Sequence, residues 1–206
     1  MARSRSSSRW LQEHVSDPYV KQAQKDGYRS RSSYKLIQLN EKDRLIRPGM
    51  LIVDLGSAPG GWSQVAARLV GDKGRVLATD ILPMDPLPNV EFVQGDFTEE
   101  PVFSELLGLL EGSKPHLVLS DMAPNISGID SADQASSIYL VELALDLARQ
   151  VLEPGGDLVA KVFQGAGADA FIKDVRTSFG KVSIRKPAAS RARSREVYIV
   201  GKGFKG

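Results

Sequence analysis

The chain has 206 residues, of which 42% are hydrophobic, enough for one domain with a sizeable core and too few for two ordinary domains. It contains no cysteine, which excludes disulfides and thiolate metal sites, and no apolar run approaches the roughly 20 residues of a membrane helix. We therefore expect one soluble cytoplasmic domain over residues 1–206, with a monomer as the default.

The net charge of +2 hides an uneven distribution of charge along the chain. Residues 1–50 hold 11 Lys and Arg against 5 Asp and Glu, residues 181–206 hold 8 against 1, and residues 51–180 hold 8 against 19. Two basic ends around an acidic middle indicate a polyanionic partner, because Lys and Arg neutralise phosphates. Two solvated basic tails remain the alternative on charge alone.

The N-terminal part reads as a basic arm over residues 1–30. Its first residues, "MARSRSSSR", have the composition of a transit peptide but are very few, so we favour an arm over a targeting signal. An Asp-Pro pair at Asp17 predicts a helix start and Gly27 its end. Ser30 or Ser32 can cap a second helix that carries Tyr34, Lys35, Leu36 and Leu39.

From residue 50 onward, short apolar runs alternate with helical segments. The runs predict strands at 50–55, 75–80, 90–94, 116–121, 157–163 and 195–200. The segments between them predict helices at 62–70, 100–110, 134–152 and 169–179. This alternation predicts an α/β fold with a doubly wound, mainly parallel, Rossmann-like sheet.

Polar side chains gather where the predicted strands end. Asp54, Asp80, Asp96 and Asp121 lie at or just beyond the ends of the first four strands, and Lys161 lies within the fifth. Because ligands bind outside the carboxyl ends of the strands in such sheets, we expect these groups to share one edge.

The stretch "VDLGSAPGGWSQ" forms the turn after the first strand. Its glycines, Gly56 to Gly61, follow a G-x-x-x-G-G pattern instead of the G-x-G-x-x-G of dinucleotide folds, which argues against a nicotinamide oxidoreductase. No phosphate-binding lysine follows, so a nucleoside suits the turn, with Asp80 accepting from ribose hydroxyls and Asp96 from a base amino group. A nucleoside without a pyrophosphate, bound through its ribose hydroxyls and its base amino group, matches S-adenosylmethionine. Tight helix–strand packing is the alternative reading of the glycines alone.

Three charged residues in or beside apolar strands are candidates for chemistry. Asp121 ends a strand, although such residues often anchor loops or cap helices. Lys161 interrupts a run expected to be buried, and its ammonium needs partners unless only its stem is buried. Glu196 opens an apolar strand, where an ion pair with Arg193 or Arg195 is the simple alternative.

Motifs over nearly the whole chain resemble those of the FtsJ-type heat-shock methyltransferase family: "RSRSSYKL", "VDLGSAPGGWSQ", "QGDF", "LSDMAPNISG", "KVFQG" and "SRARSREVYIV". The resemblance implies a methyltransferase fold with an antiparallel strand near the C-terminus. It also implies S-adenosylmethionine-dependent 2′-O-methylation of an A-loop uridine in 23S ribosomal RNA, within the large subunit or its late precursor. One departure is Ser57, where alanine is common.

The resemblance also implies roles for individual residues. The catalytic tetrad maps onto Lys35, Asp121, Lys161 and Glu196, and the cofactor set onto Gly56, Pro59, Gly60, Trp62, Asp80, Asp96 and Asp121. Lys161 is the proton acceptor in one version, and in another it stays charged and only holds the hydroxyl. Burial, Lys35 and the cationic cofactor favour the first version, whereas Asp121 and Glu196 favour the second.

The basic ends are then expected to contact RNA phosphates. The candidate residues are Arg9, Arg29, Arg31, Arg191, Arg193 and Arg195. A non-catalytic ribosomal RNA-binding assembly factor, or a 2′-O-methyltransferase for another RNA such as transfer RNA, remains an alternative. His14 and His116 offer no metal pair, so no metal is expected.

Overall fold

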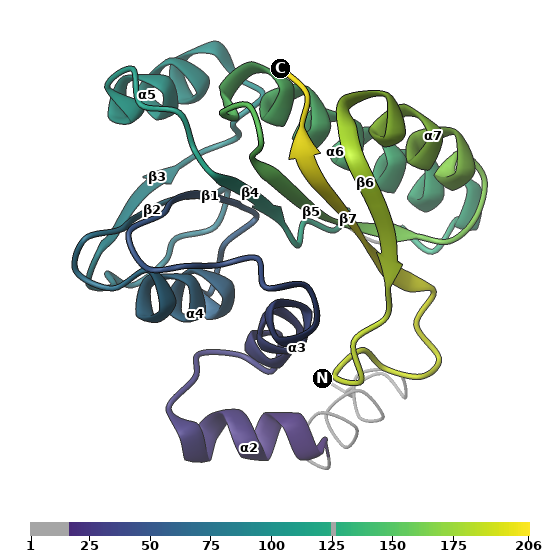
Figure 1. Cartoon of the computed structure of the whole chain (residues 1–206). Helices are drawn as coiled ribbons and strands as arrows, with labels where there is room; N and C mark the ends of the chain where they lie inside the picture. The colour runs from purple at the N-terminus through teal and green to yellow at the C-terminus, as the bar shows by residue number, and fades with distance from the viewer. Residues whose placement is uncertain (1–16, 125–126) are drawn as a thin grey trace.

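The structure is a computed structural model that describes residues 17–124 and 127–206. Its centre is a seven-stranded sheet in the order β3-β2-β1-β4-β5-β7-β6 (Figure 1). The strands are β1 (Leu51–Leu55), β2 (Arg75–Asp80), β3 (Val90–Gln94), β4 (Leu117–Ser120), β5 (Asp157–Phe163), β6 (Phe179–Arg185) and β7 (Glu196–Phe204). The order reverses between β1 and β4, which places a ligand-binding crevice at the carboxyl ends of these strands.

Strands β1 to β5 pair in parallel, and β7 inserts antiparallel between β5 and β6. The predictions of a mainly parallel doubly wound sheet and of an antiparallel strand near the C-terminus are therefore confirmed. The buried parallel strands are continuous apolar runs because helices cover both faces of the sheet.

The described helices are α2 (Pro18–Asp26), α3 (Ser33–Asp43), α4 (Gly61–Val70), α5 (Glu100–Leu110), α6 (Asp130–Val151) and α7 (Ala168–Ser178). Figure 1 shows α3 and α4 on one side of the sheet and α5, α6 and α7 on the other. Each layer has its own hydrophobic core, and the two cores alternate along the strands: Val53 and Leu55 face α5 and α6, whereas Ile52 faces α3 and α4.

The alternation of side chains along each strand decides which polar groups meet. Val159 faces the α3 and α4 layer, and so does Lys161, two residues further along β5. Tyr198 of β7, the antiparallel partner of Lys161, lies on the same face, as does Glu196 two residues before it. Several charged groups are thereby directed toward the first turn of α3.

Most predicted elements agree with the structure to within a few residues, and the largest miss is β6. The predicted helix at 169–179 ends at Ser178, and the chain then forms a strand that the sequence analysis did not predict. β6 lies at the sheet edge, and only Phe179 of its residues is buried. Its extended conformation depends on pairing with β7, which is a long-range contact.

The start of α3 differs from the expectation in its chemistry. Ser32 occupies the N-cap position, but its side chain makes no capping bond. Its hydroxyl contacts that of Ser30 at 2.7 Å, and its carbonyl accepts from the indole of Trp62 at 2.9 Å. The segment before α3 is thus attached to α4.

Candidate active site

The centre of the site is an ion pair between β5 and the end of β4. Lys161 Nζ lies 3.1 Å from Asp121 Oδ1 and also donates to the backbone carbonyl of Asp121. The Lys161 side chain is only 8% exposed, so its head group is paired inside the protein and does not extend into solvent. The buried lysine expected from the sequence therefore has the partner that burial requires.

A second ion pair joins α3 to β7. Lys35 Nζ lies 2.7 Å from Glu196 Oε1, with side chains 9% and 11% exposed. The partner of Glu196 is therefore a residue about 160 positions away in the chain, and the carboxylate is buried. The alternative of a surface ion pair between Glu196 and a neighbouring arginine therefore does not account for its buried pairing with Lys35.

Tyr198 links the two ion pairs, and the sequence analysis did not single it out. Its hydroxyl donates to Asp121 Oδ1 over 2.8 Å, and the ammonium of Lys35 lies 5.7 Å from the centre of its ring. Tyr198 is fully buried, so its hydroxyl needs a partner of this kind. Strand alternation could have found it, because it follows Glu196 by two residues.

The four charged residues form a tightly coupled group. Burial raises the pKa of Asp121, but the charges of Lys161 and Lys35 and the hydrogen bond from Tyr198 outweigh burial and leave this pKa below its ordinary value. Burial likewise raises the pKa of Glu196, and the Lys35 ammonium brings it below the ordinary value. Both carboxylates are therefore ionised near neutral pH, next to two lysines.

The pKa of Tyr198 lies well above its ordinary value, first because the ring is buried and then because Asp121 and Glu196 are negative. The phenol therefore keeps its proton at any ordinary pH. Because the ionised carboxylate of Asp121 can only accept, the phenol is the donor in this hydrogen bond.

In the turn after β1, the positions of Gly56 and Gly60 leave no room for a side chain. A Cβ on Gly56 would lie 2.5 Å from the Met122 side chain and 3.1 Å from its Cα. Gly60 has φ of +104°, and a Cβ there would lie 2.8 Å from Arg29 Nη1 and 2.9 Å from the Met84 sulfur. The turn is therefore a tightly packed backbone cradle at the start of α4, where the first helical N–H groups have no partner within the helix.

Two carboxylates flank this cradle at the ends of β2 and β3. Asp80 accepts from the amides of Ala58 and Leu82 at 2.9 and 2.8 Å, which ties it to the glycine turn. Asp96 accepts through one oxygen from the amide and hydroxyl of Thr98 at 2.9 and 2.7 Å. Each carboxylate oxygen has two lone pairs, so both residues keep acceptor capacity for hydroxyl and amino groups.

A third carboxylate lies beneath the turn. Asp54 is fully buried; its Oδ2 accepts from Ser63 at 2.6 Å, and its Oδ1 has no hydrogen-bond partner among the described residues. Burial raises the pKa of Asp54, the hydrogen bond from Ser63 lowers it, and the charges of Asp121 and Asp80 raise it again; the resulting pKa is about 7. The carboxyl ends of β1, β2 and β4 thus carry three acids within electrostatic range of one another.

These hydrogen-bond acceptors fit a nucleoside cofactor with hydroxyl and amino groups. Asp80 and Asp96 offer only acceptors, which suit hydroxyl and amino groups, while Arg29 and Met84 fill the side-chain position of Gly60. Trp62 has a supporting position: it is 3% exposed, and its ring packs 5.6 Å from that of Tyr198. Pro59 contributes its carbonyl to Arg29, at 3.3 Å.

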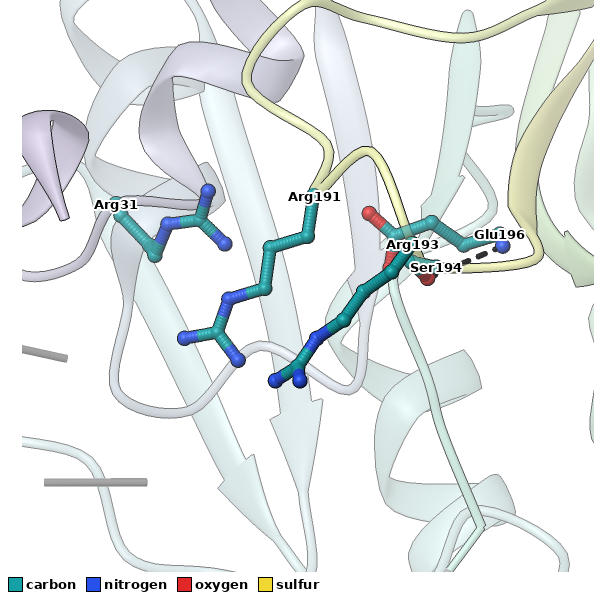
Figure 2. A pocket seen from close by; sticks show the side chains of 5 residues that line it. All are labelled: Arg31, Arg191, Arg193, Ser194 and Glu196. Carbon is teal, nitrogen blue, oxygen red and sulfur yellow. Dashed lines mark hydrogen bonds between the residues drawn. The ribbon is translucent and has the colours of Figure 1, made fainter. Parts of the chain in front are cut away.

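The basic residues expected to contact RNA separate into two groups. Figure 2 shows Arg31, Arg191 and Arg193 around a pocket of about 470 Å³, with Ser194 and Glu196 completing its lining. Arg31 holds Ala189 O at 2.7 Å and lies 2.9 Å from Asp17. The pocket therefore shares Glu196 with the buried ion pairs.

The other basic candidates lie elsewhere. Arg29 points to backbone carbonyls around the glycine turn. Arg195 is exposed next to the pocket, and Arg9 lies outside the described residues.

The described residues contain neither a metal-binding cluster nor a membrane-spanning helix. Across 17–124 and 127–206, no three His, Asp or Glu side chains come together in a way that could hold a metal ion. Within the same ranges, no helix combines the length and apolar character needed to cross a bilayer.

Over almost its whole length the chain is similar to known proteins. The family model for FtsJ-like methyltransferases matches residues 28–204. Ribosomal RNA large subunit methyltransferase E from Stutzerimonas stutzeri is 72% identical over 206 residues, all of both chains. The protein of the same name from Marinobacter nauticus is 69% identical over 205 residues, covering 100% of this chain and 99% of its own.

A solved structure from Plasmodium falciparum, described as that of a ribosomal RNA methyltransferase, superimposes with a TM-score of 0.77 at 31% identity. The match covers 87% of this chain and 100% of that one. The sequence matches and the shared fold thus agree over almost the whole chain. The chain belongs to the FtsJ-like methyltransferase family.

Proposed function

We propose that this protein is an S-adenosylmethionine-dependent 2′-O-methyltransferase that acts on 23S ribosomal RNA in the large subunit or its late precursor. The observation that carries the proposal is the buried set of two ion pairs, Lys161 with Asp121 and Lys35 with Glu196, joined through Tyr198. The names of the full-length relatives support ribosomal RNA as the substrate. An A-loop uridine is the target that the family resemblance implies, and a cytoplasmic monomer is the form we expect.

The cofactor would occupy the crevice beyond β1, β2 and β3. Asp80 would accept from the ribose hydroxyls and Asp96 from the amino group of the base, beside the glycine turn to which Asp80 is bonded. When bound, S-adenosylmethionine supplies a methyl group on a positively charged sulfur, which an oxygen nucleophile can accept. The negative charge of Asp121 favours a cationic group on this side of the sheet.

Lys161 would position the 2′-hydroxyl of the target nucleotide. An ammonium has three N–H donors, and Asp121 takes two of them, through its carboxylate and its carbonyl. The third remains to hold the incoming hydroxyl oxygen. The partners of Lys161 favour the version in which it stays charged and orients the hydroxyl, whose proton then passes to solvent in a late step.

The remaining residues would hold Lys161 in place. Tyr198 fixes the Asp121 carboxylate, and Lys35 adds positive charge that keeps it ionised. Glu196 neutralises Lys35 and connects the catalytic group to the basic pocket. Alignment of this kind can contribute many orders of magnitude to a displacement reaction.

The basic pocket would receive RNA phosphates beside the target nucleotide. Arg31, Arg191 and Arg193 line it, and its Glu196 wall belongs to the proposed catalytic set. A phosphate in this pocket would bring the neighbouring ribose toward Lys161. Contacts with phosphates position the RNA but do not read its sequence, so the target must be selected by RNA shape and further contacts.

The direct test is transfer of a labelled methyl group from S-adenosylmethionine to large subunits that lack the modification. We expect one label per subunit on a ribose 2′-oxygen, located by nuclease mapping, and no label with the Lys161→Ala variant. Transfer to transfer RNA in preference to large subunits would contradict the substrate. Failure of the protein to bind the cofactor would contradict the reaction itself.

A further inference from the structure

Arg29 joins the two backbone segments that carry the proposed cofactor residues. Its guanidinium donates to Pro59 O at 3.3 Å, to Asp85 O at 2.7 Å and to Pro86 O at 2.8 Å. Pro59 belongs to the glycine turn, and the other two residues belong to the segment that follows Asp80. The side chain thus bridges the ends of β1 and β2.

The backbone of Arg29 is itself fixed to α4. Gln64 accepts from the Arg29 amide at 3.0 Å and donates to Gly27 O at 2.8 Å. Three residues further on, the Ser32 carbonyl accepts from the Trp62 indole. The segment that was expected to be part of a basic arm is therefore attached at two points to the helix that starts at the glycine turn.

The fit between Arg29 and the turn is close. A Cβ on Gly60 would lie 2.8 Å from Nη1 of Arg29 and 3.1 Å from its Cδ, so the side chain occupies the space that the glycine leaves. A guanidinium has a planar fork of five N–H donors and can reach carbonyls of two segments together, whereas a lysine ammonium acts as a point charge.

We propose that Arg29 is a positioning residue for the cofactor site and not a phosphate ligand. It holds the glycine turn and the segment after Asp80 at the separation that the cofactor needs. Its three hydrogen bonds are directed to this backbone. The inference rests on the proposed function, because that function places the cofactor at this turn.

Arg29→Lys tests the proposal, since it keeps the positive charge and removes the fork. We expect the dissociation constant for S-adenosylhomocysteine, measured by calorimetry, to rise about tenfold or more, because hydrogen bonds of a charged group are lost. The KM for S-adenosylmethionine should rise similarly, while kcat at saturating cofactor stays within about threefold. Affinity for a large-subunit RNA fragment at fixed salt should stay within about twofold.

Arg47→Lys is the matched control, because Arg47 is exposed and precedes β1 at the other end of the strand. It should leave all four quantities unchanged. Amide hydrogen exchange adds a readout that needs no cofactor. In Arg29→Lys, the hydrogen-bonded amides of Ser57, Ala58, Gly60 and Leu82 should exchange faster while β1 stays protected.

The outcomes separate the two proposals. Wild-type protein that binds no S-adenosylhomocysteine would overturn the proposed function, while the exchange experiment would still test the bridge made by Arg29. An Arg29→Lys variant with unchanged exchange and wild-type cofactor affinity would overturn the role of Arg29. Weaker RNA binding by Arg29→Lys with unchanged cofactor binding would overturn the proposal and show that Arg29 contacts RNA phosphates.

Discussion

The hydroxyl of Tyr198 and the ammonium of Lys161 meet at one carboxylate oxygen, Asp121 Oδ1, at 2.8 and 3.1 Å. Tyr198→Phe removes one hydrogen bond to this buried charge and keeps the ring that packs on Trp62. We expect kcat for methyl transfer to fall about tenfold to a hundredfold, because a hydrogen bond to a charged group contributes roughly 1.5–3 kcal/mol. Cofactor affinity should change little. Steady-state kinetics with modification-free large subunits measure both, and an unchanged kcat would remove Tyr198 from the catalytic group.

Lys161→Ala should abolish methyl transfer, since among residues 17–124 and 127–206 no other side chain contacts both Oδ1 and the backbone carbonyl of Asp121. The site proposed for the cofactor lies at the ends of β1, β2 and β3, so the dissociation constant for S-adenosylhomocysteine should stay within a few-fold. Single-turnover assays and calorimetry test the two statements. Because the variant leaves Asp121 buried without its ammonium, thermal unfolding is measured alongside. Strong residual turnover would contradict the role of Lys161.

Gly60→Ala should disrupt the cradle, because the new methyl group would lie 2.8 Å from Arg29 and 2.9 Å from Met84, at a φ of +104°. We expect cofactor affinity to fall at least tenfold and the melting temperature to drop. Gly108→Ala is the matched control: it lies in α5, and nothing would lie within 4 Å of its Cβ. This control should stabilise the protein by roughly 0.5–1 kcal/mol without affecting binding. Equal behaviour of the two variants would contradict the assignment of the turn.

Asp54 should make stability depend on pH below neutrality. Its pKa is about 7 in the folded protein and 3.8 in ordinary surroundings, so between these values the folded state keeps a proton that the unfolded chain releases. Raising the pH from about 4 to about 7 should therefore lower the free energy of unfolding by up to a few kcal/mol, with no further change above that range.

Comparison of wild type with Asp54→Asn isolates this contribution from those of Asp121 and Glu196. The stability of wild type relative to the variant, measured by urea unfolding at a series of pH values, should fall over this window. Asp72→Asn, at an exposed position, should give a curve parallel to that of wild type. If the curve of Asp54→Asn also ran parallel to that of wild type between about pH 4 and pH 7, Asp54 would be ionised in the folded protein over this range.

Arg191→Ala should weaken RNA binding without affecting the cofactor, because Arg191 lines the basic pocket beside Glu196 (Figure 2). Affinity should fall similarly for RNAs of different sequence, and the slope of log affinity against log salt should decrease by about 1 in magnitude. Arg176→Ala, exposed on α7 across the sheet, is the control and should change neither. An unchanged slope for Arg191→Ala would argue against a phosphate contact.

The sequence by itself determined the layered α/β fold and the edge of the sheet at which the site lies. Strands such as 75–80 and 157–163 follow from local apolar runs, and the acids at 54, 80, 96 and 121 follow from where those runs end. Such signals are local, because side-chain periodicity depends only on neighbouring residues. The glycine turn and the charges of Lys161 and Glu196 in apolar strands could be read in the same way, whereas the tetrad that adds Lys35 came from the resemblance to the family.

The tertiary structure alone decided the partners. It paired Lys35 with Glu196 and Lys161 with Asp121, placed Tyr198 between them, added β6 at the sheet edge, and directed Arg29 to backbone carbonyls. These contacts join residues from 13 to about 160 positions apart, and no local pattern specifies them. They depend on strand order and register, which follow from packing the whole chain, so a basic residue such as Arg29 reveals its role only when its neighbours are known.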